Sequence, residues 1–254
     1  MGVLGDILAN KRLEIEHLRG EPAPSPPPRP PRPHGLIRPG SLALIAEIKR
    51  RSPSAGALST ALSPAERGRA YEAAGASAIS VLTDGPFFDG SFEHLRDVAS
   101  AVSIPVLCKD FVLDERQIEL AAASGASLIL LIVRILDDAR LTALTAAARA
   151  HGLEPLVEVT THDELSRALA AGATVIGVNA RDLDTLIMDR ARAANVLAAI
   201  PSGLVAIHLS GLATPDDVRR VAPRADAALL GEALMRLDDP APLLRDLVSA
   251  AQGR

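Results

Sequence analysis

The 254-residue chain contains no tryptophan, one tyrosine and four phenylalanines. A hydrophobic core therefore has to be packed from Ala, Val, Leu and Ile, and the hydrophobic share of 48% supplies enough of them. The single cysteine, Cys108, excludes an intrachain disulfide and fits a reducing compartment. Its position in an apolar segment predicts a small buried strand residue.

The chain also lacks an excess of positive charge and any long apolar run. The net charge of −4 argues against a general nucleic-acid binder, although local positive charge would suffice for a small anion. The longest strongly apolar stretch, 128–133, is far shorter than the roughly 20 residues that span a bilayer. The N-terminus lacks the uninterrupted apolar core of a signal peptide. We therefore expect a cytoplasmic protein that binds neither nucleic acid nor membrane.

The N-terminal region differs from the rest of the chain. Apolar residues at helical spacing predict a helix over residues 3–19, with Lys11 and Glu14 on its polar side. A proline-rich run follows at 21–35 and would form extended polyproline II. A ligand for an SH3 domain is the alternative interpretation, but a strap that ties the helix to a domain is favoured. We expect residues 1–35 to form helix and strap, and 36–254 to form one catalytic domain.

From residue 42 onward, short apolar strands alternate with amphipathic helical stretches. Strands are predicted at 42–48, 78–82, 105–109, 127–133, 155–159, 174–178, 204–209 and 227–230. Helices are predicted near 64–74, 92–101, 114–124, 137–151, 161–171, 189–199, 214–222 and 240–251. This alternation indicates a parallel α/β fold. A doubly wound open sheet is the competitor, but it usually has a glycine-rich turn after its first strand, and none is present. Eight complete units favour a TIM (β/α)8 barrel with an extra N-terminal helix.

Polar residues occur where these strands end, which is where a barrel of this type builds its active site. Glu47 and Lys49 are two positions apart, so their side chains emerge on the same side of a strand. Lys109, Glu158, Asn179 and Arg181 occupy the corresponding positions of later strands, whereas the strand at 127–133 ends in apolar residues only. Singly, each could be an ion pair at the rim. Together they predict a site for general acid–base chemistry, because clustered Lys and Glu residues shift each other's pKa values.

Glycines after the last two strands predict an anion site. Gly211 and Gly231 would let the backbone approach a phosphate closely, and Ser52 could add a hydroxyl. Glu232 looks unsuited to an anion, but its backbone N–H can still contribute while its side chain points away. The six histidines show no metal-ligand spacing, and only His208 is kept as a supporting residue.

The sequence at these positions resembles the indole-3-glycerol phosphate synthase family. The matching segments extend, in the expected order, over nearly all of residues 42–236. They are AEIKRRSPSAG (46–56), SVLTDGPFFDGS (80–91), VLCKDFVLDERQI (106–118), LLIV (130–133), PLVEV (155–159), IGVNARDLDTL (176–186), LSGL (209–212) and LLGEALMR (229–236). The combination is far more specific than any single motif.

The resemblance implies that a ribulose-phosphate adduct of anthranilate closes to an indole with loss of carbon dioxide and water. It implies no metal or organic cofactor. Lys109 would be the general acid, and Glu158 and Lys49 would serve the proton transfers of dehydration.

The remaining roles are also carried over from the resemblance. Glu47, Asn179 and Arg181 would position the reacting groups, and Ser210 is counted with the catalytic residues. Phosphate would be bound at Ser52, Gly211 and Gly231, and the anthranilate ring would pack on Phe88 and Phe111. Glu232 is added to the substrate-binding residues because of its backbone N–H beside Gly231.

One departure from the family pattern stands out. The family usually has Glu-Ser-Gly at the end of the seventh strand, where this chain has Leu209-Ser210-Gly211. Losing a polar partner from a desolvated site costs roughly 1–3 kcal/mol, or about one to two decades in rate. The departure predicts a slower or more weakly binding enzyme, with His208 as a partial substitute.

Two other functions fit parts of this sequence. A phosphoribosylanthranilate isomerase would be expected to use a Cys and Asp pair, to which the lone Cys108 points poorly. The alternative outside the enzymes is a barrel that binds a phosphorylated ligand without turning it over. Leu209, in place of the usual Glu, suggests this alternative. For the synthase we expect a monomer that acts on a small phosphorylated substrate.

Overall fold

Eight parallel strands close into a barrel in the computed structural model, which describes residues 2–20 and 40–252. Neighbours around the barrel follow the order β1-β10-β9-β8-β7-β6-β5-β4. The strands are β1 (Ala43–Ile48), β4 (Ala78–Leu82), β5 (Val106–Lys109), β6 (Leu128–Ile132), β7 (Glu154–Val159), β8 (Val175–Asn179), β9 (Val205–Leu209) and β10 (Ala227–Leu230). Closure between β1 and β10 confirms the TIM barrel and rules out the open sheet.

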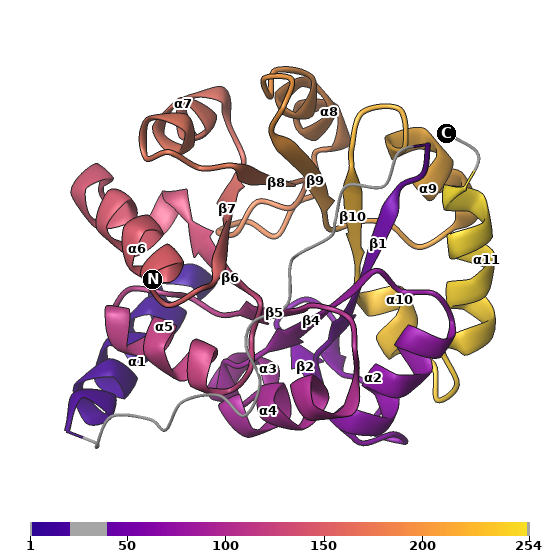
Figure 1. Ribbon diagram of the computed structural model, residues 1–254, viewed down its shortest axis with the longest axis horizontal. Coiled ribbons are helices and arrows are strands. Elements are labelled where there is room, and N and C mark those ends of the chain that lie inside the picture. Colours follow the sequence, from indigo (N-terminus) through magenta and orange to yellow (C-terminus); the bar gives the residue numbers. More distant parts are fainter. Residues whose placement is uncertain (1, 21–39, 253–254) are drawn as a thin grey trace.

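Helices surround this barrel and alternate with its strands (Figure 1). They are α2 (Pro64–Ala73), α4 (Phe92–Ala101), α5 (Glu115–Ala123), α6 (Asp138–Ala150), α7 (His162–Ala170), α8 (Arg190–Ala198), α9 (Pro215–Val221) and α11 (Ala241–Ala251). The predicted N-terminal helix is α1 (Val3–Arg19), which packs beside α5. The predicted proline-rich strap at 21–35 lies outside the described residues.

Polar capping residues begin most of the surrounding helices and so end the loops that follow the strands. Each cap side chain accepts a hydrogen bond from a backbone N–H of the first helical turn, which satisfies a group that the helix leaves open. Ser63, Ser91, Asp114, Asp137, Thr161, Asp189 and Thr214 serve in this way. Because these caps follow the carboxyl ends of the strands, they fix the geometry of the loops that build the site.

The core consists of two layers, as alternation along each strand requires. Side chains such as Ile45, Leu107 and Leu156 fill the barrel interior, whereas Leu44 and Ile129 pack between the strands and the helices. Small and branched aliphatic residues dominate both layers.

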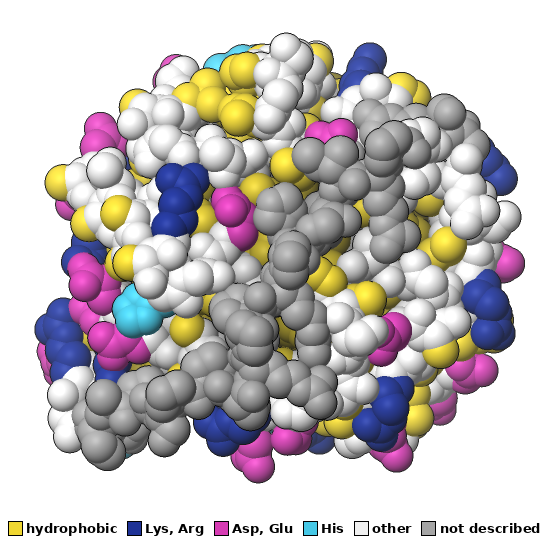
Figure 2. All heavy atoms as spheres, viewed as in Figure 1, with side chains coloured by type: hydrophobic (Ala, Val, Ile, Leu, Met, Phe, Trp, Pro, Cys, Tyr) yellow, Lys and Arg dark blue, Asp and Glu magenta, His cyan; other side chains and the backbone are white. Residues whose placement is uncertain are grey.

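No helix among the described residues is long and apolar enough to cross a membrane. On the face drawn in Figure 2, acidic and basic side chains are interspersed rather than separated.

Several short elements were not predicted. A two-stranded hairpin, β2 (Arg51–Ser52) with β3 (Gly56–Ala57), lies in the loop after β1. One-turn helices α3 (Gly85–Phe88) and α10 (Glu232–Met235) follow β4 and β10, and a 3₁₀ turn, η1 (Val133–Ile135), follows β6. All of them belong to the loops at the carboxyl ends of strands, where they shape the site.

Candidate active site

A cavity of about 580 Å³ lies at the carboxyl ends of the barrel strands. All thirteen residues that the sequence predicted for the site line it. These are Glu47, Lys49, Ser52, Phe88, Lys109, Phe111, Glu158, Asn179, Arg181, Ser210, Gly211, Gly231 and Glu232. They come from seven of the eight strand ends, so the closed barrel alone explains why residues so distant in sequence meet.

One side of the cavity holds a buried carboxylate between two ammonium groups. Glu47 Oε1 lies 2.5 Å from Lys49 Nζ, and Glu47 Oε2 lies 3.7 Å from Lys109 Nζ. Burial alone would raise the pKa of Glu47, but the two lysines outweigh burial and lower it. Glu47 therefore stays ionised and holds both lysine side chains toward the cavity.

The second carboxylate is in a different environment. Glu158 is buried, and this burial raises its pKa although the nearby Lys109 charge and a hydrogen bond from Asn179 oppose the effect. Asn179 Nδ2 donates to Glu158 Oε1 at 2.9 Å, and Asn179 Oδ1 accepts from the backbone N–H of Arg181 at 2.9 Å. The amide is thereby oriented. Two carboxylates whose pKa values are pushed apart are suited to different roles, one as a fixed charge and one as a proton carrier.

The aromatic end of the cavity is formed by two phenylalanines and by α1. The rings of Phe88 and Phe111 lie with their centroids 6.1 Å apart and their planes inclined by 35°. Val3, Leu4 and Ile7 of α1 complete this apolar wall. Sequence reasoning predicted α1 but not its place in the site, because its apolar spacing is that of any amphipathic helix.

The opposite end has the features of an anion site. Ser210 and Gly211 both adopt left-handed backbone conformations, with φ of 70° and 80°. Gly231 passes so close to Glu47 that a Cβ there would overlap its Oε1 and lie 3.0 Å from Lys49 Nζ. A larger residue at this position would have to displace the Glu47 carboxylate.

Arginines that the sequence analysis missed also line this end. Arg236 Nη2 lies 2.7 Å from Glu232 Oε1. The negative charge that made Glu232 look unsuited to an anion site is therefore neutralised by a residue one helical turn further on. The spacing of four residues could have revealed this pair. Arg190 lines the cavity and donates from Nη2 to the Gly211 carbonyl oxygen at 3.2 Å. No sequence motif marks Arg190.

The two residues at the departure from the family pattern lie elsewhere. Leu209 belongs to the apolar interior of the barrel and does not line the cavity. His208 points to the outer side, toward Ala194 and Leu197 of α8, and its Nε2 lies 3.1 Å from the Ser210 carbonyl oxygen. The suggestion that His208 substitutes for a missing carboxylate is therefore wrong, because adjacent strand residues face opposite sides.

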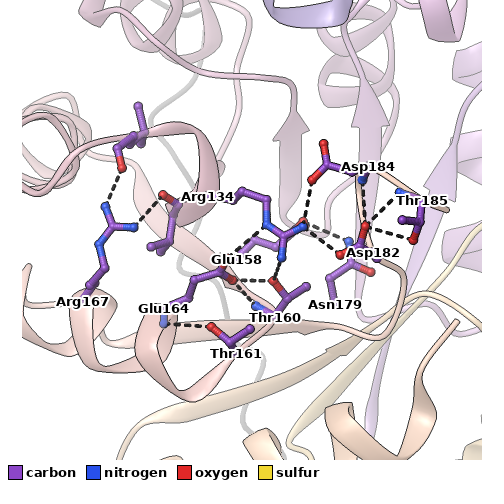
Figure 3. Close-up of polar contacts among 12 residues, drawn as sticks. Arg134, Glu158, Thr160, Thr161, Glu164, Arg167, Asn179, Asp182, Asp184 and Thr185 are labelled. Carbon is purple, nitrogen blue, oxygen red and sulfur yellow. Dashed lines mark hydrogen bonds and ion pairs between the residues drawn. The ribbon is translucent and has the colours of Figure 1, made fainter. Parts of the chain in front are cut away.

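Arg134 of η1 links three successive loops at the strand ends (Figure 3). Its guanidinium lies 3.2 Å from Glu164 Oε1 and 2.8 Å from Asp182 Oδ2, and its Nη2 donates to Thr160 Oγ1 at 3.1 Å. Asp182 in turn accepts backbone hydrogen bonds from residues 184 and 185. The strand predicted to contribute only apolar atoms is thus followed by the residue that orders the loop after β8.

The loop after β8 also contributes to the cavity directly. Four of its residues line the cavity: Arg181, Leu183, Leu186 and Met188. Within residues 2–20 and 40–252, no group of three or more His, Cys, Asp or Glu side chains is placed to hold a metal ion.

The fold and this cavity define a (β/α)8 barrel of the enzyme type, whose strand ends bring two lysines and two glutamates together between an apolar wall and glycine-containing loops. A family model described as indole-3-glycerol phosphate synthase matches residues 9–247. The chain belongs to this family.

Curated relatives agree with that assignment. An indole-3-glycerol phosphate synthase of Mycobacteroides abscessus is 44% identical over 250 residues, covering 98% of this chain and 92% of the relative. One of Nocardioides sp. is 45% identical over 255 residues, covering 96% and 97%.

Among solved structures, a thiamine phosphate pyrophosphorylase from Pyrococcus furiosus superposes with a TM-score of 0.64 at 14% identity, covering 86% of this chain and 96% of that one. A 3-hexulose-6-phosphate synthase gives 0.64 at 21%, covering 82% and 99%. At such identities the structures show a shared fold only.

Proposed function

We propose that the chain converts 1-(2-carboxyphenylamino)-1-deoxyribulose 5-phosphate to indole-3-glycerol phosphate, the carboxy-lyase step of tryptophan biosynthesis. The observation that carries the proposal is the joint presence, in one cavity, of the two lysines, the two carboxylates, an apolar wall and a glycine-lined anion site. The substrate has matching parts in the same order: an aromatic ring, a reacting ketone and a phosphate. We propose that the protein acts as a monomer in the cytoplasm.

Ring closure requires an acid at the ketone. The ring carbon that bears the carboxylate attacks the carbonyl carbon, and the carbonyl oxygen takes a proton from Lys109 Nζ. Breaking the bond to the carboxylate releases carbon dioxide and restores the aromatic ring. Glu47, 3.7 Å from Lys109, keeps the ammonium group directed at this oxygen.

Dehydration requires one more acid and one base. The new hydroxyl group leaves as water after protonation, and the adjacent nitrogen-bearing carbon loses a proton to form the indole double bond. Glu158 and Lys49 serve these two transfers. Asn179 holds Glu158 in place, and Arg181 orients that amide through its backbone N–H.

A direct turnover assay tests the proposal. Because the chain has no tryptophan and only one tyrosine, the absorbance and fluorescence of a newly formed indole stand out against the protein. We expect indole and carbon dioxide to appear in equal amounts. A protein that binds the reduced substrate analogue but releases no indole would instead be a binding barrel.

Leu209 provides a graded test of the same proposal. Leu209 pairs directly with Asn179 in the register of β8 and β9, so a longer polar side chain there would reach toward the Glu158–Asn179 pair. We expect Leu209→Glu to raise kcat/KM about tenfold by restoring a polar partner to the desolvated site. Leu209→Met, which keeps an apolar side chain of similar volume, is the matched control. Steady-state kinetics that are the same for all three proteins would contradict this account.

A further inference from the structure

Lys11 was expected on the polar side of α1 but is buried, and the proposed mechanism does not use it. Its side chain is 0% exposed, and its Nζ lies 2.8 Å from Asp110 Oδ1, 3.1 Å from Asp84 Oδ2 and 2.7 Å from Glu14 Oε2. Burial alone lowers the pKa of Lys11, but the surrounding carboxylates outweigh burial and raise it. The ammonium group is therefore firmly charged, and leaving any of the buried partners unpaired would be costly.

The two aspartates belong to the loops that carry the aromatic wall. Asp84 caps α3 by accepting from the Phe87 N–H at 3.0 Å, and α3 contains Phe88. Asp110 accepts from the Phe111 N–H at 2.7 Å and, through its second oxygen, from Thr83 Oγ1 at 2.7 Å. Asp110 also directly follows Lys109. One ammonium group thus joins α1 to the loops after β4 and β5.

Lys11 also fixes how α1 is rotated. Leu4, Ile7, Lys11 and Ile15 are its buried residues, which places them along one helix face. Fixing Lys11 between the two aspartates therefore turns Leu4 and Ile7 toward the cavity. The far end of α1 has its own anchor, because Arg116 Nε donates to the Leu18 carbonyl oxygen at 3.2 Å.

We propose that Lys11 is a positioning residue that holds the first half of α1 over the aromatic end of the cavity, so that Val3, Leu4 and Ile7 close on the ring of the substrate. The identity of that ring rests on the proposed function. The apolar wall would then form only while the ion pairs hold. A purely structural role would instead affect stability and leave the two ends of the substrate equally bound.

Two small probes separate these possibilities in the full-length protein. Anthranilate reports on the aromatic end and can be followed by its own fluorescence, and inorganic phosphate reports on the end at Gly211 and Gly231. For Lys11→Met we expect the Kd of anthranilate to rise about tenfold, as lost burial of one apolar side chain implies, and the Kd of phosphate to stay within about twofold. With the whole substrate, KM rises more than kcat falls.

Arg12→Met is the matched control, because Arg12 is the next residue in α1, carries the same charge and is exposed. Both Kd values should stay at the wild-type level. Ile7→Ala keeps the ion pairs and trims only the wall, so it should weaken anthranilate selectively even if Lys11→Met proves too unstable to study. The proposal would be overturned if, in Lys11→Met and Ile7→Ala, the Kd values of anthranilate and phosphate rose by the same factor. It would also be overturned if neither Kd changed in these variants.

Failure of the proposed function would look different. In that case the wild-type protein would release no indole, whatever the probes show. An active wild-type enzyme whose Lys11→Met variant binds anthranilate normally would overturn only the role of Lys11.

Discussion

Replacing Lys109 by methionine is expected to lower kcat by about 10²–10⁴-fold, because methionine has a similar shape but no proton to donate. The Kd of the reduced substrate analogue should change far less, since the aromatic wall and the anion site remain. Stopped-flow detection of indole in a single turnover would separate the chemical step from product release.

Lys109→Arg is the informative companion. Arginine keeps the positive charge beside Glu47 but holds its proton too tightly to act as a general acid. If proton donation is the role of Lys109, the arginine variant should be nearly as slow as the methionine variant. A kcat for Lys109→Arg close to that of wild type would show that charge alone suffices.

Glu158→Gln is expected to combine a large loss of activity with a gain in stability. The amide keeps the shape of the side chain but cannot carry a proton, so kcat should fall by about 10²–10⁴-fold. The folded protein raises the pKa of Glu158, so the stability this group contributes is present at low pH and is lost as pH rises through the folded pKa. At pH 7 the glutamine variant should therefore unfold at a higher temperature than wild type, and at pH 4 this advantage should be lost.

Glu47→Gln is the matched contrast. The pKa of Glu47 is lowered in the folded protein, so its contribution is present at neutral pH and is lost as pH falls through the folded pKa. The glutamine variant should unfold at a lower temperature than wild type at pH 7. Thermal unfolding of both variants across this pH range checks the opposite signs. Equal signs at pH 7 would show that the two carboxylates do not have the different environments described above.

The pattern of apolar residues in the sequence predicted every strand of the barrel, because a strand buried on both faces consists of a short run of apolar residues. The site followed from the fold, since a barrel brings all carboxyl strand ends together and Lys109 or Glu158 needed only to stand at such an end. Contacts that depend on how a strand or helix is rotated about its own axis could not be predicted from periodicity. The outward orientation of His208 required the strand register, and the place of α1 required the buried partners of Lys11.

The loops were the least predictable part. The hairpin β2–β3 contains only two residues in each strand, too few for any alternation to show. Arg134 was missed because one arginine after an apolar strand resembles a solvated rim residue. Its partners Glu164 and Asp182 lie 30 and 48 residues further along the chain, and only the folded barrel makes them neighbours.

The Arg134 cluster has a consequence for engineering by loop exchange. The loop after β8 is fastened by an arginine from the β6 unit and is linked through it to Glu164 in the β7 unit, so its conformation is encoded in three separate segments. Transplanting this loop alone into another barrel would carry the aspartates without their counter-charge. The smallest transferable piece therefore runs from β6 to the start of α8, about a quarter of the chain, and substrate-range libraries that vary this loop should leave Arg134, Glu164 and Asp182 unchanged.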